Sequence, residues 1–276
     1  MVKRAGVVGW PVAHSLSPTI HAWWAQQEGA EARYDAIPVE PTDEAFARAV
    51  AELRAAGYAG VNVTIPHKER ALKIADEASA AARAIGAANM LTFSAKGVIA
   101  ANSDATAIRR ILLDLPQRPR NVLVLGAGGA ARAALWAIKS LSDAPRIAVA
   151  NRTRSRAEDI AAIGDAEVAN WSDRSRALAA ADLVINATSL GMRGQPPLDL
   201  DFDSLSSDAT VFDTVYAPLE TPLLAAARAR GLAVIDGLEM LMRQAAPGYL
   251  AWLGEAAPLG PALRAHLLAA IARRGA

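Results

Sequence analysis

Short apolar runs alternate along the chain with longer segments of helical periodicity. Runs rich in Val, Ile and Ala that end at glycine, asparagine or proline predict buried strands, and the segments between them predict helices. In the first hundred residues the expected strands are Ala5–Gly9, Arg33–Val39 and Gly60–Ile65. The expected helices there are Thr19–Gly29, Thr42–Ala56 and Lys68–Ala75. This alternation indicates a mostly parallel sheet with helices on its faces.

The same alternation continues in the second half of the chain. The stretch 121–134 predicts a strand, a tight turn and a helix, and about six strands are expected in this half. The further strands expected are Arg146–Ala150, Asp182–Thr188, Thr210–Tyr216 and Ala233–Ile235. Such a number is typical of a doubled mononucleotide-binding fold. We therefore expect an α/β protein: a mostly parallel N-terminal domain followed by a doubly wound, Rossmann-type domain.

The turn within 121–134 matches a phosphate-binding fingerprint. Gly126, Gly128 and Ala131 fit G-x-G-x-x-G/A, in which the first glycine makes the turn and the second admits a pyrophosphate. The helix that follows offers unpaired N–H groups to phosphates. The alternative is a tight turn that uses glycine for steric reasons alone. The cofactor-binding residues expected here are Gly126, Ala127, Gly128, Gly129 and Ala130.

A basic segment follows the second strand of this half. In NAD-binding versions of the fold an acidic residue near this position binds the ribose 2′-hydroxyl, whereas here the chain has arginines, which suit a 2′-phosphate. A plain basic helix start is the alternative, although cations there oppose the helix dipole. The sequence therefore favours NADP over NAD. The residues expected to contact the 2′-phosphate are Asn151, Arg152, Thr153 and Arg156.

The later loops of this half complete the expected cofactor site. Ligands of open α/β sheets bind outside the carboxyl ends of the strands, so the loop 189–197 is expected to border the nicotinamide. We add Thr188, at the end of its strand, and Gly237, at the start of the closing helices, to the expected cofactor-binding residues.

Polar residues gather at strand ends in the first half. Ser15 and Ser17 follow the first strand, where one serine could cap the next helix or both could bind a carboxylate through neutral hydrogen bonds. Capping is the simpler interpretation of this loop alone. In the third strand Asn62 and Thr64 point to one face, and Lys68 follows. Two further segments carry Asn89 and, at a helix start, Asn102 and Asp104.

Composition excludes several classes of function. Lys and Arg number 29 against 28 for Asp and Glu, so no overall charge favours nucleic acid. Without cysteine there is no disulfide and no thiolate ligand, and no pair among the four histidines has a metal-ligand spacing. We expect no metal and no membrane segment, and a cytoplasmic location. The sequence leaves the assembly open as monomer or homodimer.

Four motifs together resemble the shikimate dehydrogenase family in order and spacing. They are Gly9-x-Pro11-x-x-His14-Ser15-x-Ser17-Pro18, Asn62-Val63-Thr64-x-Pro66-x-Lys68, Gly86-Ala87-Ala88-Asn89 and Asn102-x-Asp104. Further matches are Asn151-Arg152-Thr153, the Asn-Ala-Thr-Ser-x-Gly-Met stretch from Asn186, Tyr216-x-Pro218 and Met240-Leu241-x-x-Gln244. The resemblance covers nearly the whole chain.

The resemblance implies an activity and residue roles. The family reduces 3-dehydroshikimate to shikimate with NADPH, reversibly, in aromatic amino acid biosynthesis. Lys68 and Asp104 would form the catalytic pair. The residues implied to bind substrate are Ser15, Ser17, Asn62, Thr64, Asn89, Tyr216 and Gln244, with Asp104 also at a ring hydroxyl. Because Gln244 must reach the first half, the expected domains are 1–104 with 238–276 for substrate and 105–237 for NADP.

Departures from the family pattern leave alternatives open. Ala22, Met90, Ala101, Ser103, Thr214 and Glu239 stand where the family commonly has other residues. Met90 and Ser103 lie near the expected pocket, so a dehydrogenase for quinate or an aminated analogue is the nearest alternative. A non-catalytic NADP-binding sensor is another, and the pair Lys68 and Asp104 argues against it. Folate-type or tRNA-linked reductases explain only the cofactor half.

Overall fold

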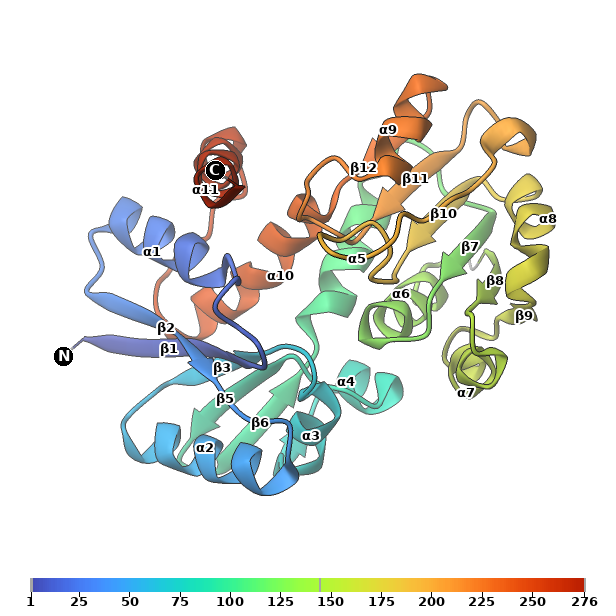
Figure 1. Cartoon of the computed structure of the whole chain (residues 1–276). Coiled ribbons are helices and arrows are strands. Elements are labelled where there is room, and N and C mark those ends of the chain that lie inside the picture. The colour runs from blue at the N-terminus through green and yellow to red at the C-terminus, as the bar shows by residue number, and fades with distance from the viewer. Residues whose placement is uncertain (1, 144, 276) are drawn as a thin grey trace. The chain divides into compact units, whose positions relative to one another are not determined.

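The computed structural model describes residues 2–143 and 145–275 (Figure 1). The chain divides into two compact units, which we call the substrate unit (Met1–Ser103 with Met242–Ala276) and the nucleotide unit (Asp104–Leu241). The expected boundaries, 1–104 with 238–276 and 105–237, stay a prediction, because contacts within each unit do not test whether either part folds alone. Within the described residues, no helix is long and apolar enough to cross a membrane.

The substrate unit is built on a sheet with the strand order β2-β1-β3-β5-β6-β4. Its strands are β1 (Lys3–Gly9), β2 (Ala32–Pro38), β3 (Gly60–Val63), β4 (Glu77–Ala78), β5 (Met90–Ser94) and β6 (Gly97–Ala101). Strand β1 pairs in parallel with both β2 and β3, as the sequence predicts. Strands β5 and β6 form an antiparallel hairpin that sequence reasoning missed, because these short strands lack a clear alternation of apolar and polar residues.

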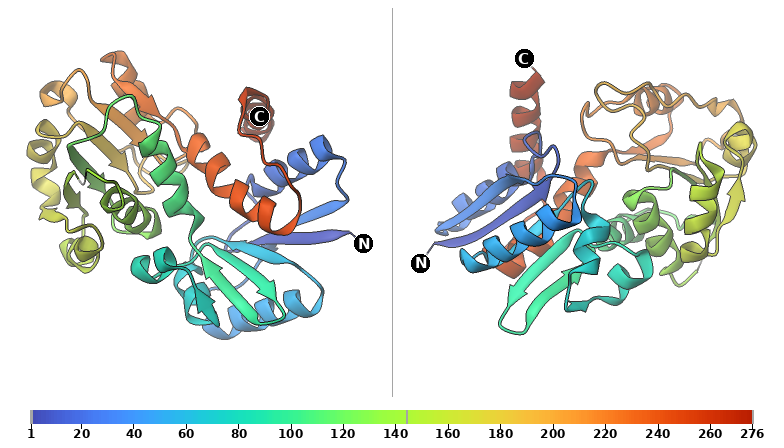
Figure 2. Two further views of the ribbon diagram at one scale, coloured as in Figure 1. Left: turned by 180° about the vertical axis from the view of Figure 1, so that it is seen from behind. Right: turned by 60° about the horizontal axis from the view of Figure 1, so that its bottom comes forward.

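Helices cover both faces of this sheet (Figures 1 and 2). They are α1 (Ser17–Glu28), α2 (Asp43–Ala55), α3 (Lys68–Lys73), α4 (Ala80–Ile85), α11 (Pro261–Gly275) and the part of α10 (Gly237–Trp252) from Met242 onward. Phe46 of α2 packs with Val61 and Val63 on one face. On α1, Trp24 is fully buried and its ring lies 5.2 Å from that of Tyr249, so it is a core residue.

The N-termini of α2 and α1 differ in side-chain capping. The Thr42 hydroxyl accepts a hydrogen bond from the Ala45 N–H at 3.1 Å, so Thr42 caps α2. Helix α1 has Leu16 at its N-cap and no side-chain cap, so the expectation that a serine caps this helix is wrong. The Ser15 hydroxyl instead accepts the Ser17 N–H at 3.2 Å, which orders the loop before the helix.

The nucleotide unit has the strand order β12-β11-β10-β7-β8-β9. Its strands are β7 (Asn121–Leu125), β8 (Arg146–Ala150), β9 (Glu167–Ala169), β10 (Leu183–Asn186), β11 (Thr210–Asp213) and β12 (Ala233–Ile235). All of its strand pairings are parallel among the described residues. The order runs outward in both directions from the β7–β10 pair, which is the doubly wound arrangement expected from the sequence.

Helices lie on both faces of this second sheet (Figure 2). They are α5 (Ser103–Leu113, from Asp104 onward), α6 (Gly129–Lys139), α7 (Arg154–Gly164), α8 (Arg174–Ala179), α9 (Pro222–Ala229) and the first residues of α10. Leu178 of α8 and Leu224 of α9 pack with Leu123 and Val211 of the sheet. Since the direction of winding changes between β7 and β10, the loops after these strands frame the crevice where such sheets bind ligands.

Candidate functional site

In the substrate unit, the predicted residues lie at the carboxyl ends of neighbouring strands. Ser15 and Ser17 follow β1, and Thr64 and Lys68 follow β3. Because β1 and β3 pair in parallel, with Val8 opposite Val63, these loops meet at one edge of the sheet. Asn62 lies within β3 and is almost fully buried. The strand pairing thus brings the residues that carry these hydroxyl, amide and ammonium groups to one edge of the sheet.

Tyr34 connects two of these residues, and sequence reasoning did not single it out. Its hydroxyl donates to Asn62 Oδ1 at 2.7 Å and accepts a hydrogen bond from the Ser17 hydroxyl. The ring of His21 stacks on Tyr34, with 3.7 Å between ring centroids, and its Nδ1 lies 2.8 Å from the Ser17 carbonyl oxygen. The sequence signal was limited to a single aromatic residue within an edge strand of mixed polar and apolar residues.

Backbone hydrogen bonds bring Lys68 and Asn89 to this cluster. The Ala88 N–H donates to the Lys68 carbonyl at 2.8 Å, and the Val63 N–H donates to the Asn89 carbonyl at 2.8 Å. The Asn62 amide nitrogen donates to the same Asn89 carbonyl at 3.3 Å. Lys68, at the start of α3, is half-buried. Its backbone is therefore fixed beside the segment that carries Asn89.

The side chain of Asn89 is held by Ser103. The Ser103 N–H donates to Asn89 Oδ1 at 2.7 Å, and Asn89 Nδ2 donates to the Ser103 hydroxyl at 3.1 Å. Asn102 donates to the Ala87 carbonyl at 3.0 Å and so fixes the same turn. The departure at Ser103 therefore retains a hydroxyl that orients Asn89. Asp104 follows in the first turn of α5 and is 5% exposed.

Gln244 lies on a helix face that packs near Asn62. A Cβ atom added to Gly248 would lie 3.2 Å from Asn62 Oδ1, so α10 passes close to that amide. Gln244 is one helical turn before Gly248 and therefore shares its face. The sequence did not anticipate the role of Gly248, which allows this close approach. Met240 and Met242 on the same helix are buried.

Burial of His21 predicts acid sensitivity of the fold. Desolvation lowers the pKa of His21 from 6.5 to about 4, although its hydrogen bond to Ser17 opposes the shift. In the unfolded chain His21 is protonated below about pH 6.5, whereas in the folded chain it is protonated only below about pH 4. The free energy of unfolding therefore decreases as the pH falls from 6.5 to 4. Integrating this uptake gives a loss of about 2 kcal/mol by pH 5.

Replacing His21 with asparagine is expected to flatten this dependence, because the amide can donate to the Ser17 carbonyl without titrating. Urea unfolding at pH 7 and pH 5 measures the effect as the difference in free energy of unfolding. His266→Asn, at a half-buried histidine of α11, is the matched control. An unchanged difference in His21→Asn would show that another group causes the acid sensitivity.

In the nucleotide unit, the glycines of the fingerprint have different physical reasons to be glycine. Gly126 has φ of 113°, and a Cβ there would lie 2.7 Å from the Ala187 carbonyl oxygen. Gly128 has φ of −87°, which any residue adopts, and a Cβ there meets nothing within 4 Å. The steric explanation therefore holds for Gly126 only. The N-cap of α6 is therefore open at the position where the fingerprint predicts a pyrophosphate.

Replacing Gly128 with alanine is therefore expected to weaken NADP binding by about tenfold, which corresponds to about 1.4 kcal/mol, without lowering the melting temperature. Titration of NADP against the purified variant measures the affinity. Gly126→Ala serves as the contrast and is expected to lose stability, because it combines a positive φ with a backbone clash. Unchanged NADP affinity in a folded Gly128→Ala protein would contradict the fingerprint.

The basic segment after β8 contains arginines in two different states. Arg154 binds Glu158 at 2.8 Å and the Asn170 side chain at 2.6 Å, so it is engaged within the unit. Arg152 and Arg156 are exposed, and no side-chain partner is found for either among the described residues. Thr153 stands at the N-cap of α7 without capping it. These groups are placed to hold an anion at the carboxyl end of β8.

Asn151 has a supporting contact in this turn, because its Nδ2 donates to the Thr153 carbonyl at 2.9 Å. Ala127, Gly129 and Ala130 occupy the turn and the first residues of α6. The expected contacts of all these residues with a cofactor stay predictions.

A buried polar network orders the loops after β10 and β11. Asn186 Oδ1 accepts from the Thr188 hydroxyl at 2.7 Å, and Asn186 Nδ2 donates to Asp213 Oδ1 at 2.9 Å. Asp213 Oδ2 accepts the Thr221 hydroxyl at 2.6 Å. Burial raises the pKa of Asp213, while its three hydrogen-bond donors, the Thr221 hydroxyl, the Val215 N–H and the Asn186 amide, oppose the rise. Sequence reasoning identified Thr188 but missed Asp213 and Thr221, which fix it.

The other two predicted residues of this unit lie nearby in the chain. Tyr216 follows β11 and is half-buried. A Cβ added to Gly237 would lie 2.5 Å from the Thr214 and Val215 carbonyl oxygens, so the fold itself requires glycine there. Gly237 therefore has a structural role, and its contact with a cofactor stays a prediction.

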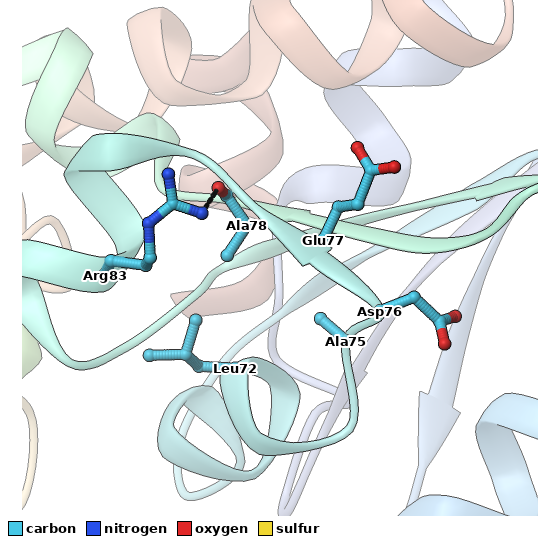
Figure 3. Close-up of a pocket in the computed structure, with 6 residues that line it drawn as sticks. All are labelled: Leu72, Ala75, Asp76, Glu77, Ala78 and Arg83. Carbon is cyan, nitrogen blue, oxygen red and sulfur yellow. Dashed lines mark hydrogen bonds between the residues drawn. The ribbon is translucent and has the colours of Figure 1, made fainter.

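Two surface hollows lie away from the predicted residues. One, of about 640 Å³, is in the substrate unit and is lined by Leu72, Ala75, Asp76, Glu77, Ala78 and Arg83 (Figure 3). Asp76 there accepts the Val98 N–H at 2.7 Å and so supports the β5–β6 hairpin. The other, of about 520 Å³, includes Asn121, Arg146 and Glu167, the first residues of their strands. It lies at the opposite end of that sheet from the glycine turn.

Comparisons with known proteins agree across the chain. A family model described as the shikimate dehydrogenase substrate binding domain matches residues 7–91, and one described as shikimate / quinate 5-dehydrogenase matches residues 108–191. A shikimate dehydrogenase (NADP(+)) from Methylocella silvestris is 47% identical over 95% of this chain and 94% of its own length. One from Rhodospirillum rubrum is 46% identical over 96% and 97%.

Solved structures give the same result. The shikimate 5-dehydrogenase of Thermus thermophilus, in complex with NADP(H) and shikimate, superposes with a TM-score of 0.85 at 33% identity and covers both chains fully. The quinate dehydrogenase of Corynebacterium glutamicum, in complex with NAD, has a TM-score of 0.88 at 28% identity and covers 97% of this chain and 99% of its own.

Proposed function

The chain belongs to the shikimate dehydrogenase family, and on this premise we propose that it catalyses the NADP-dependent, reversible reduction of 3-dehydroshikimate to shikimate. The observation that carries this proposal is the cluster at the carboxyl ends of β1 and β3, where Ser17, Asn62 and Lys68 come together. A polyhydroxylated ring acid needs such a set: neutral donors for its carboxylate and hydroxyls, and a cation near the reacting oxygen.

Each of these residues is assigned to a different part of the substrate. The hydroxyls of Ser15 and Ser17 bind the carboxylate, and the amides of Asn62 and Asn89 bind ring hydroxyls. Thr64, Tyr216 and Gln244 complete the proposed substrate-binding set. Bound NADPH would supply the hydride for the carbonyl carbon. The Lys68 ammonium gives a proton to the former carbonyl oxygen, and Asp104 orients Lys68 and a neighbouring hydroxyl. Lys68 then regains its proton from solvent.

The nucleotide unit has the features that NADP requires. Gly128 leaves space for the pyrophosphate at the start of α6, and the exposed Arg152 and Arg156 suit the 2′-phosphate. Thr188, at the end of the β10 segment, is held in place by Asn186 and is proposed to contact the nicotinamide half. These assignments rest on the chemistry of the donors and on their place at the carboxyl ends of the strands.

The test is an absorbance assay at the NADPH band with shikimate and NADP. Quinate in place of shikimate and NAD in place of NADP are the parallel controls. Turnover with shikimate and NADP that exceeds every other combination is the expected result. Preferred turnover of quinate would identify the alternative substrate, and NADP binding without turnover of either acid would identify a sensor.

The location and the assembly of the protein belong to the same proposal. We propose a cytoplasmic location and a monomer or homodimer as the assembly. Light scattering coupled to size-exclusion chromatography distinguishes a monomer from a homodimer, and a larger particle would contradict both of these assemblies.

A further inference from the structure

The hydroxyl of Tyr34 lies between two proposed substrate ligands. It donates to Asn62 Oδ1 at 2.7 Å and accepts the hydrogen bond of the Ser17 hydroxyl. Ser17 is proposed to bind the carboxylate, and Asn62 a ring hydroxyl. One oxygen atom, on β2, thus joins groups that come from α1 and β3.

We propose that Tyr34 is a positioning residue that sets the orientation of Asn62 and Ser17 for the substrate, an inference that rests on the proposed function. An asparagine amide can turn over and exchange its oxygen and nitrogen. Because the Tyr34 hydroxyl donates to Oδ1, the nitrogen of Asn62 faces away from Tyr34. That nitrogen has two hydrogens, and only one is needed for the Asn89 carbonyl. The other is presented to a substrate oxygen.

The environment of Tyr34 favours the protonated form of its phenol. Burial raises the pKa of Tyr34 well above its usual value, although the hydrogen bond from Ser17 opposes the shift. The phenol therefore keeps its proton at neutral pH and remains a donor to Asn62. Its ring is held from behind by His21, stacked at 3.7 Å between centroids with an interplanar angle of 17°. His21 is itself fixed by the Ser17 carbonyl at 2.8 Å.

Ser17 changes partner when the substrate arrives. Its hydroxyl donates to the neutral Tyr34 oxygen in the structure. Hydrogen bonds to an ionised acceptor are stronger than bonds to a neutral one, so the hydroxyl turns to the substrate carboxylate when that is present. Tyr34 keeps the Ser17 hydroxyl oriented until that moment, and it continues to hold Asn62 afterwards.

Replacing Tyr34 with phenylalanine is expected to raise the KM for shikimate about tenfold, because Asn62 Oδ1 loses its donor and the amide is free to turn. The KM for NADP and kcat are expected to stay within twofold. Steady-state kinetics with each substrate varied in turn measures this split. An equal rise of both KM values would indicate a general structural effect and would overturn the proposal.

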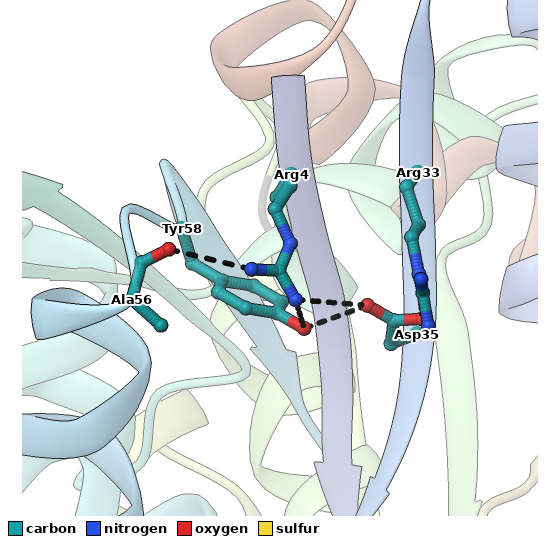
Figure 4. Close-up of polar contacts among 5 residues, drawn as sticks. All are labelled: Arg4, Arg33, Asp35, Ala56 and Tyr58. Carbon is teal, nitrogen blue, oxygen red and sulfur yellow. Dashed lines mark hydrogen bonds and ion pairs between the residues drawn. The ribbon is translucent and has the colours of Figure 1, made fainter. Parts of the chain in front are cut away.

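Tyr58 provides a matched control in the same unit. Its hydroxyl donates to Asp35 at 2.6 Å and accepts from Arg4 at 2.8 Å, beside the first residues of β1 and ahead of β3 (Figure 4). Asp35 follows Tyr34 in β2 and therefore points to the opposite face of the sheet. Tyr58→Phe loses the same hydroxyl and is expected to leave the KM for shikimate within twofold.

Ser17→Ala separates failure of this inference from failure of the proposed function. If Tyr34 acts through Ser17 and Asn62, the KM of Ser17→Ala/Tyr34→Phe is expected to be lower than the product of the single effects. Multiplicative effects would overturn the coupling. A raised KM in Ser17→Ala with none in Tyr34→Phe would refute the positioning role alone. A normal KM in Ser17→Ala would instead refute the proposed carboxylate site.

Discussion

Replacing Lys68 with methionine is expected to lower kcat for shikimate oxidation about 10³-fold while the KM values change little. Methionine keeps most of the length of the side chain but removes the ammonium that exchanges a proton with the reacting oxygen, and general acid–base groups typically contribute factors of this size. Because this contact is strongest in the transition state, the loss falls on kcat. Initial rates at saturating shikimate and NADP measure it.

Lys73→Met is the matched control, since it makes the same change at an exposed residue of the same short helix, α3. It is expected to keep full activity. NADP affinity of Lys68→Met is expected to remain normal, which shows that the variant is folded. A Lys68→Met enzyme with near-normal kcat and a raised KM would assign Lys68 to substrate binding alone and leave the proton donor to be found elsewhere.

Removing the two exposed arginines is expected to reverse the cofactor preference. In Arg152→Ala/Arg156→Ala, two charge-assisted contacts to the 2′-phosphate are lost, each of about 1.5 to 3 kcal/mol, so NADP affinity is expected to fall by at least 10²-fold. NAD has no 2′-phosphate and should bind as before. Kinetics of shikimate oxidation with NADP and with NAD, at one ionic strength, give the ratio of kcat/KM values.

Arg154 tests whether position or charge alone decides this preference. It lies in the same segment but is engaged by Glu158 and Asn170. Arg154→Ala is expected to keep the preference for NADP. An equal loss in Arg154→Ala would mean that the summed charge of the segment attracts the cofactor, and the assignment of individual arginines would then be wrong.

The sequence predicts those parts of the site that lie in continuous motifs. The turn at Gly126, the doubly wound sheet and the strand ends at Asn62 and Arg152 were all readable, because local periodicity and charge identify them. The hairpin β5–β6 was missed because its short strands lack a clear alternation of apolar and polar residues. The serine cap was predicted wrongly because Ser15 and Ser17 can both bind backbone groups, and local sequence does not decide between these partners.

Residues that act through others were the hardest to find. Tyr34 and His21 belong to no motif with a mechanism, and their importance comes from contacts made by residues distant in the chain. The role of Asp213 was likewise not predicted, since an aspartate at the end of a buried strand is ordinarily a turn residue. Its hydrogen bonds to Asn186 and Thr221 appear only when β10 and β11 are paired.

The two glycines of the turn after β7 should diverge differently under relaxed selection. Gly126 is favoured by a positive φ and by the nearby Ala187 carbonyl, so the stability of the fold depends on it. Gly128 faces open space, so only the proposed ligand requires glycine there. A descendant that lost its cofactor but kept its fold would retain the first glycine and accumulate side chains at the second. That asymmetry would record the loss of binding in sequence alone.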